Sequence, residues 1–113
     1  MITIYHNPRC GKSRACLTYL ETANKSFKIV KYLENPISKE ELTEIITKLN
    51  IPAIELVRTK EKIWIEQFKG KQLTEADVIT AILENPILME RPVVVYNNKA
   101  IIARPLSLIE SIF

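Results

Sequence analysis

The first 33 residues constrain the fold most strongly, because they run through the patterns of a strand, a turn, a helix and a second strand. Residues 2–6 alternate Ile with Thr and Tyr, which is typical of a strand. Residues 12–23 carry apolar side chains at helical spacing, and residues 27–33 indicate the second strand. Elements in this order form a right-handed crossover that places two parallel strands side by side.

The rest of the chain predicts helices followed by a hairpin. Ser38 and Glu41 form a capping-box pattern before an amphipathic helix, and Thr74 opens another helix. Residues 93–96 and 100–103 flank a turn at Asn97-Asn98, and residues 106–112 indicate a last short helix. The order predicts an α/β fold, a thioredoxin-like four-stranded mixed sheet flanked by helices, with a helical insertion before the C-terminal β-hairpin. We expect a single domain over residues 1–113, since this length suits one compact core.

Charge and hydropathy narrow the class of partner. The net charge is +3, with Lys and Glu interleaved and no run of like charges that would suggest a nucleic-acid tail. A small anion held by a few arginines fits this balance better than a long polyanion. No apolar stretch approaches the roughly 20 residues of a membrane span, and no signal-peptide pattern is visible, so we expect a cytoplasmic protein with no membrane partner. From the charge pattern we expect no nucleic-acid partner, and we also expect a monomer.

Cys10 is the candidate reactive group, since it stands at the junction between the first strand and the first helix. A helix N-terminus presents unpaired N–H groups and partial positive charge, both of which stabilise a thiolate. Arg9, Lys12 and Arg14 add positive charge, and His6 lies at the strand end. Such surroundings lower the pKa of a cysteine and make it a nucleophile at neutral pH.

Several other thiol chemistries are disfavoured. Position 13 is Ser, so there is no C-x-x-C for a dithiol redox cycle. A phosphatase loop would need an arginine at position 16, where Cys16 stands on the apolar face of the helix. We expect Cys16 to be a buried, inert thiol. One His and two Cys do not supply a four-ligand zinc site, so no metal is expected.

Two Arg-Pro pairs lie at opposite ends of the predicted hairpin, Arg91-Pro92 and Arg104-Pro105. In a thioredoxin-like sheet the loop before this hairpin commonly carries a cis proline that faces the active cysteine, so Pro92 is a candidate for a cis bond. Arg58 follows a short apolar helix.

The segment from His6 to Arg14 resembles the His-Asn-Pro-x-Cys-Gly-x-Ser-Arg signature of the glutaredoxin-coupled arsenate reductases, the ArsC family. The resemblance continues through residues 32–34, 85–88 and 91–95 and ends at residues 103–105, so it covers nearly the whole chain. It implies that Cys10 attacks arsenate, that His6 helps to lower the Cys10 pKa, and that three arginines hold the oxyanion. The implied arginines are Arg58, Arg91 and Arg104. The supporting loop residues are Asn7, Gly11, Lys12, Ser13 and Arg14.

The resemblance implies reduction of arsenate to arsenite, with no bound cofactor, glutathione as co-substrate and glutaredoxin as partner. Two alternatives stay open at this point. One is a non-enzymatic Spx-type regulator that binds RNA polymerase, although that group usually carries a C-x-x-C motif. The other is a monothiol glutaredoxin-like protein, because Cys10-Gly11-Lys12-Ser13 resembles the C-G-x-S of that family. The predicted helical insertion and the Arg-Pro pairs argue against the second.

Overall fold

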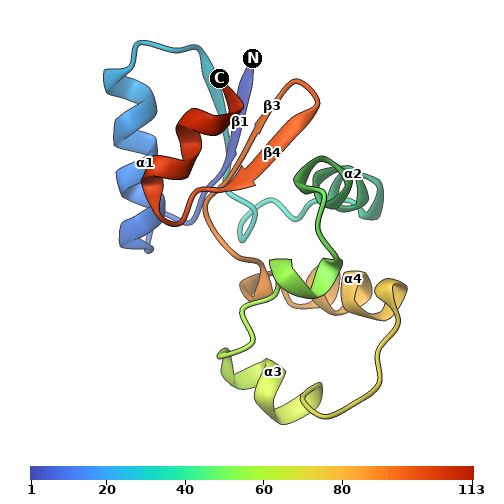
Figure 1. Cartoon of the computed structure of the whole chain (residues 1–113). Coiled ribbons are helices and arrows are strands. Elements are labelled where there is room, and N and C mark those ends of the chain that lie inside the picture. Colours follow the sequence, from blue (N-terminus) through green and yellow to red (C-terminus); the bar gives the residue numbers. More distant parts are fainter. The chain divides into compact units, whose positions relative to one another are not determined.

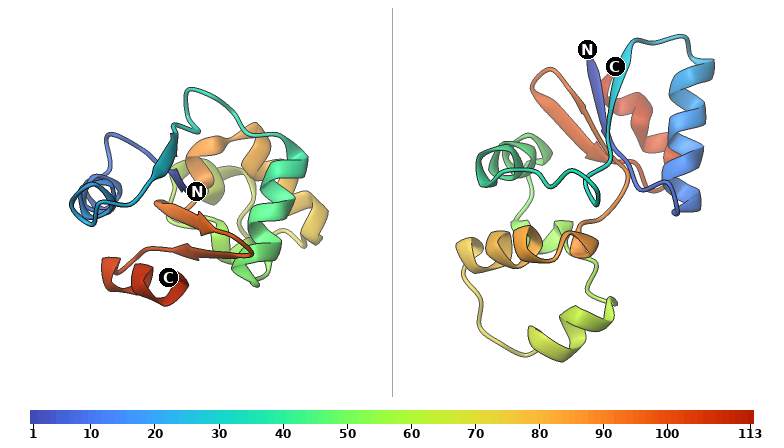
Figure 2. Two further views of the ribbon diagram at one scale, coloured as in Figure 1. Left: turned by 90° about the horizontal axis from the view of Figure 1, so that it is seen from above. Right: turned by 180° about the vertical axis from the view of Figure 1, so that it is seen from behind.

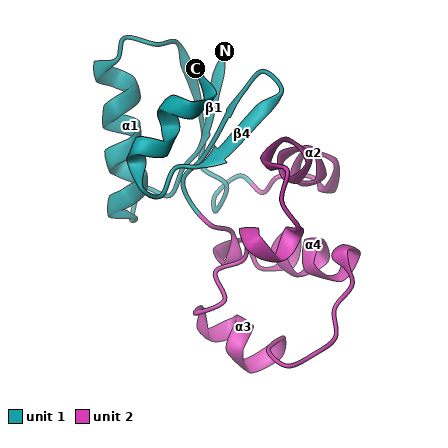
Figure 3. Cartoon of the chain, viewed as in Figure 1, with its two compact units in different colours: residues 1–35, 91–113 teal, residues 36–90 magenta.

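The computed structural model describes residues 1–113 and divides into two compact units (Figure 3). The first comprises Met1–Asn35 and Arg91–Phe113, and the second comprises Pro36–Glu90. The chain therefore leaves the first unit after one strand pair and returns to it for the hairpin. This confirms the helical insertion, whereas a single domain over residues 1–113 stays a prediction. No helix combines the length and hydrophobicity needed to cross a membrane.

The first unit contains a four-stranded mixed sheet in the order β2-β1-β3-β4 (Figure 1). Its strands are β1 (Ile2–Tyr5), β2 (Phe27–Val30), β3 (Val93–Tyr96) and β4 (Lys99–Ile102). β1 pairs with β2 in parallel and with β3 antiparallel, and β3 pairs antiparallel with β4. The predicted thioredoxin-like α/β fold is thus confirmed, and the β-branched residues of β1 and β3 form its centre.

One face of the sheet is covered by α1 (Gly11–Thr22) and by the 3-10 helix η3 (Leu106–Ile112) (Figure 2). The core between these layers includes Ile4 and Val94 from the strands, Leu20 from α1 and Ile109 from η3, all fully buried. Each such side chain contributes about 1.5–3 kcal/mol when it leaves water. This packing holds the start of α1 against the end of β1, where Cys10 lies.

Some element boundaries differ from the sequence prediction. The first helix begins and ends one residue earlier than expected, at Gly11 and Thr22. The strand predicted over residues 27–33 ends at Val30, because the N–H groups of Glu34 and Asn35 bond to the Lys31 carbonyl and close a turn. The hairpin turn is present, and Asn97 adopts a left-handed φ of 56° there.

The second unit is helical. It contains α2 (Lys39–Leu49), η1 (Ala53–Leu56), α3 (Lys62–Gln67), α4 (Glu75–Glu84) and η2 (Pro86–Leu88). The Ser38 hydroxyl accepts from the Glu41 N–H at the start of α2, and Thr74 and Asp77 form a complete capping box at the start of α4. Apolar faces of α2 and α4 pack together, with Leu42, Ile45 and Ile82 buried.

The sequence did not predict α3. Its six residues are too few to show a helical period. Trp64 is buried, and it stacks on Phe68 at the end of the same helix, with ring centroids 5.2 Å apart. An isolated antiparallel bridge between Val57 and Met89 ties the segment before α3 to the end of the unit.

Candidate active site

Cys10 is the N-cap residue of α1, with an extended backbone (φ −95°, ψ 122°). Its N–H donates to the Asn7 carbonyl at 3.0 Å, and its own carbonyl accepts from the Arg14 N–H at 3.0 Å. The side chain is 9% exposed. Cys10 thus stands at the start of α1, where the first N–H groups of the helix have no partner within it.

Three buried polar residues hold the loop that carries Cys10: His6, Asn7 and Ser13. The Ser13 hydroxyl lies 2.7 Å from Nδ1 of His6 and accepts from the Asn7 N–H at 3.0 Å. The Asn7 side-chain oxygen in turn accepts from the Arg9 N–H at 3.0 Å. Because removing a partner from a buried polar group costs about 1–3 kcal/mol, this network fixes the path of the loop around Cys10.

His6 contributes to the site as a hydrogen-bonding group. Burial lowers the pKa of its imidazole, and the positive charges of Lys31 and Arg14 lower it further, against the opposing effect of Ser13. The ring is therefore neutral at pH 7, and Ser13 can donate its O–H to Nδ1 while it accepts from Asn7. In this arrangement His6 positions Ser13, whose backbone N–H faces the Cys10 sulfur.

The Cys10 thiolate is stabilised by its neighbours. Burial alone would raise the pKa of Cys10, but hydrogen bonds from the Ser13 N–H, the Arg91 guanidinium and the Lys12 N–H, together with the charge of Arg91, bring it below the ordinary value. The Lys12 and Ser13 N–H groups belong to the first turn of α1, whereas Arg91 lies just before β3. The arrangement keeps a nucleophilic sulfur beside a cationic donor.

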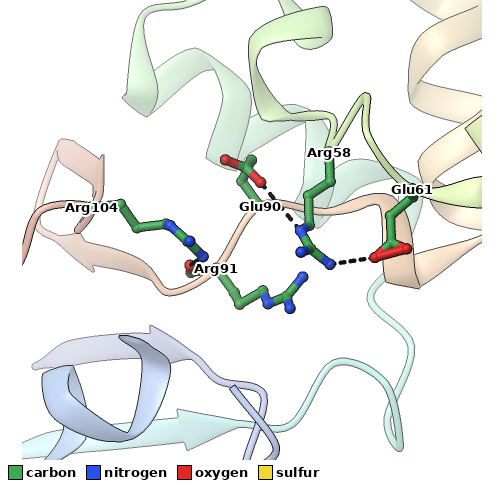
Figure 4. A network of polar contacts seen from close by, with 5 residues as sticks. All are labelled: Arg58, Glu61, Glu90, Arg91 and Arg104. Carbon is green, nitrogen blue, oxygen red and sulfur yellow. Dashed lines mark hydrogen bonds and ion pairs between the residues drawn. The ribbon is translucent and has the colours of Figure 1, made fainter. Parts of the chain in front are cut away.

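Arg91 and Arg104 lie at the two ends of the hairpin in the first unit. Nη1 of Arg104 donates to the Arg91 carbonyl at 3.2 Å (Figure 4). Nε of Arg91 is buried and has no hydrogen-bond partner. The peptide bonds that precede Pro92 and Pro105 are both cis, the second of which was not anticipated from the sequence. Arg91 thus has an unused donor on the side chain that stabilises the Cys10 thiolate.

Arg58 belongs to the second unit, where it contacts two carboxylates (Figure 4). Its Nη1 bonds to Glu61, and its Nε lies 3.5 Å from Glu90. Sequence reasoning missed both glutamates. The spacing of three residues between Arg58 and Glu61 was a local signal that could have found one of them, whereas Glu90 is brought in only by the bridge between Val57 and Met89.

The other loop residues have distinct places. Lys12 is exposed, and it contributes through its backbone N–H. Nη1 of Arg14 donates to the Pro8 carbonyl at 3.0 Å, so it braces the loop from outside. A Cβ on Gly11 would meet only Nη2 of Arg14, at an ordinary 3.7 Å, so a small side chain fits at Gly11.

Cys16 differs from Cys10 in every respect that affects reactivity. It is fully buried in the core, and burial raises its pKa to about 11. Both cysteines are free thiols. No group of three His, Cys, Asp or Glu side chains is placed to hold a metal ion. Only the Cys10 sulfur combines a lowered pKa with a cationic neighbour.

The lowered pKa of Cys10 predicts a definite pH dependence. The thiolate fraction should persist below the pH at which a free thiol (pKa about 8.5) protonates, and alkylation by iodoacetamide should slow only when the pH falls through the lower midpoint. Thiolate absorbance in the ultraviolet, titrated against pH, measures that midpoint. Because burial raises the pKa of Cys16 to about 11, its ionisation should be separate from that of Cys10. A first midpoint at or above about 8.5 would contradict the structure.

Known proteins resemble this chain over its whole length. The model of the ArsC family matches residues 5–112. An arsenate reductase of Neisseria meningitidis is 39% identical over 113 residues, which cover 98% of this chain and 97% of the relative. An uncharacterized protein of Escherichia coli K12, YfgD, is 42% identical over 92% of this chain and 89% of its own. The solved structure of an arsenate reductase from Vibrio cholerae superimposes with a TM-score of 0.95 at 37% identity, covering 99% of this chain and 97% of that one.

Proposed function

The chain belongs to the ArsC family, and from this premise we propose that it is an arsenate reductase that uses the Cys10 thiolate and takes electrons from glutathione. The observation that carries the proposal is the placement of Cys10 at the N-cap of α1, with a lowered pKa and the Arg91 guanidinium beside it. A thiolate nucleophile next to a planar cationic donor suits attack on a small tetrahedral oxyanion.

The first step is a displacement at arsenic. Sγ of Cys10 attacks arsenate, an S–As bond forms, and an As–O bond breaks to release hydroxide, which leaves as water after taking a proton. Arsenic stays As(V) in this step. The N–H groups of Lys12 and Ser13 and the Arg91 guanidinium, which stabilise the thiolate in the free protein, would then face the oxygens of the bound oxyanion.

The second step transfers the electrons. A glutathione thiolate attacks Sγ of the adduct, an S–S bond forms, and the S–As bond breaks with its electron pair going to arsenic. Arsenic becomes As(III) and leaves as arsenite, while two thiolates become the Cys10–glutathione disulfide. Glutaredoxin then restores Cys10 by thiol–disulfide exchange. The buried Cys16 takes no part in this cycle.

The arginines contribute unequally in this proposal. Arg91 binds the oxyanion directly through its guanidinium, whose Nε has no partner in the free protein, and Arg104 holds the Arg91 carbonyl and supplies positive charge. Arg58 is proposed as a third ligand from the family resemblance and is held by two carboxylates in the free protein.

A coupled assay tests the proposed function. With glutathione, glutaredoxin, glutathione reductase and NADPH present, arsenate should cause NADPH oxidation, and omission of glutathione or glutaredoxin should stop it. Turnover supported by thioredoxin and thioredoxin reductase alone would refute the proposed electron donor. No turnover with either system, together with recovery of RNA polymerase in a pull-down, would favour the regulator instead.

A further inference from the structure

The backbone around Arg58 is fixed by a short antiparallel pairing within the second unit. The Arg58 N–H donates to the Leu88 carbonyl at 2.7 Å, and the Glu90 N–H donates to the Leu56 carbonyl at 2.8 Å, on either side of the bridge between Val57 and Met89. In such a pairing, Arg58 and Glu90 project from the same face at diagonal positions, where long side chains can meet.

Glu61 approaches the same guanidinium from the turn that follows. Its N–H donates to the Arg58 carbonyl at 3.0 Å, and its carboxylate bonds to Nη1 of Arg58. The three side chains are about one quarter exposed (25% for Arg58, 24% for Glu61, 28% for Glu90), so the ion pairs are only partly screened by solvent. One positive charge faces two negative charges, and the cluster carries a net charge of −1.

We infer that Glu61 and Glu90 control anion binding at Arg58, because they engage Nη1 and Nε of its guanidinium in the free protein, and an oxyanion that takes either nitrogen displaces the carboxylate bound to it. The inference rests on the proposed function, in which Arg58 is a ligand of the substrate oxyanion. It adds two specificity-determining residues to that reaction.

The exchange favours particular anions. A carboxylate brings one negative charge to the guanidinium, whereas phosphate and arsenate dianions bring two and offer several oxygens to the planar fork. Because Coulomb attraction scales with charge, a dianion competes with the glutamates better than a monoanion does. The two carboxylates therefore weaken anion binding at Arg58, and they weaken the binding of a monoanion more than that of a dianion.

Glu90→Gln and Glu61→Gln test the inference by anion binding, which does not depend on turnover. Inorganic phosphate is the probe, and isothermal titration calorimetry at low salt gives its Kd. Each variant should bind phosphate about two- to fivefold more tightly than the parent chain, the factor expected for loss of a partly exposed ion pair. The matched control is Glu66→Gln, which removes the same charge from an exposed pair with Lys62 in the same unit and should change Kd little.

A double-mutant cycle separates local from general charge effects. In an Arg58→Ala background, Glu90→Gln should give no gain, because no guanidinium is left to release. The inference would be overturned if Glu66→Gln gave an equal gain or if the gain persisted without Arg58. It would also be overturned if both Gln variants bound phosphate no more tightly than the parent, or if no phosphate bound at all. Thermal unfolding checks each fold, and Glu61→Gln is the second variant should Glu90→Gln unfold. A chain that fails the arsenate assay yet shows the expected phosphate pattern would refute the reductase and leave the inference standing.

Discussion

Replacement of Cys10 by Ser is expected to abolish arsenate-dependent NADPH oxidation while the fold stays intact. Serine keeps the shape and the N-cap position, but its hydroxyl does not ionise near neutral pH and cannot form the S–As bond. The coupled assay measures the loss, and circular dichroism with thermal unfolding checks the fold. Because serine is a favoured N-cap residue, we expect little change in stability.

The matched control is Cys16→Ala. Cys16 lies fully buried on the core face of α1, and burial raises its pKa to about 11. Its removal should therefore leave most of the turnover and cost stability through a small cavity. Activity retained by Cys10→Ser would contradict the site. A Cys16→Ala variant that is folded but as inactive as Cys10→Ser would show that Cys16 resolves an intermediate.

Arg91→Ala should have the second-largest effect, a fall of about a hundredfold or more in kcat/KM for arsenate, as for loss of a preorganised oxyanion donor. The same change should raise the pKa of Cys10, since Arg91 both bonds to the thiolate and attracts it. Measuring kcat/KM across a pH series separates these contributions. At a pH where Cys10 is fully ionised in both the parent protein and Arg91→Ala, the remaining deficit in kcat/KM measures the loss of oxyanion binding.

Arg91→Lys should recover only part of the activity, because it restores the charge and not the planar fork. Arg9→Ala is the control. Arg9 is an exposed arginine of the loop that carries Cys10, and its contact in the site is made by its backbone N–H. A loss as large in Arg9→Ala as in Arg91→Ala would show that general positive charge is responsible. An unchanged Cys10 pKa in Arg91→Ala would contradict the geometry described here.

Local chemistry explains why so much of this site could be predicted. A helix N-terminus and its flanking residues lie within a few positions of Cys10, so the strand, the loop and the first turn of α1 follow from adjacent residues. The same holds for the amphipathic pattern of α2 and the hairpin at Asn97-Asn98. The short helix α3 escaped prediction because its six residues are too few to show a helical period.

The sequence by itself determined the order of elements, the mixed sheet and the reactive Cys10, because periodicity and turn residues act over short distances. Only the tertiary structure decided which charges meet. Arg91 stabilises the thiolate of Cys10, which lies 81 positions away in the chain. Glu90 reaches Arg58 through a bridge between distant segments, and burial makes His6 neutral. Ion pairing and desolvation depend on distance in space, and no spacing in the sequence encodes that distance.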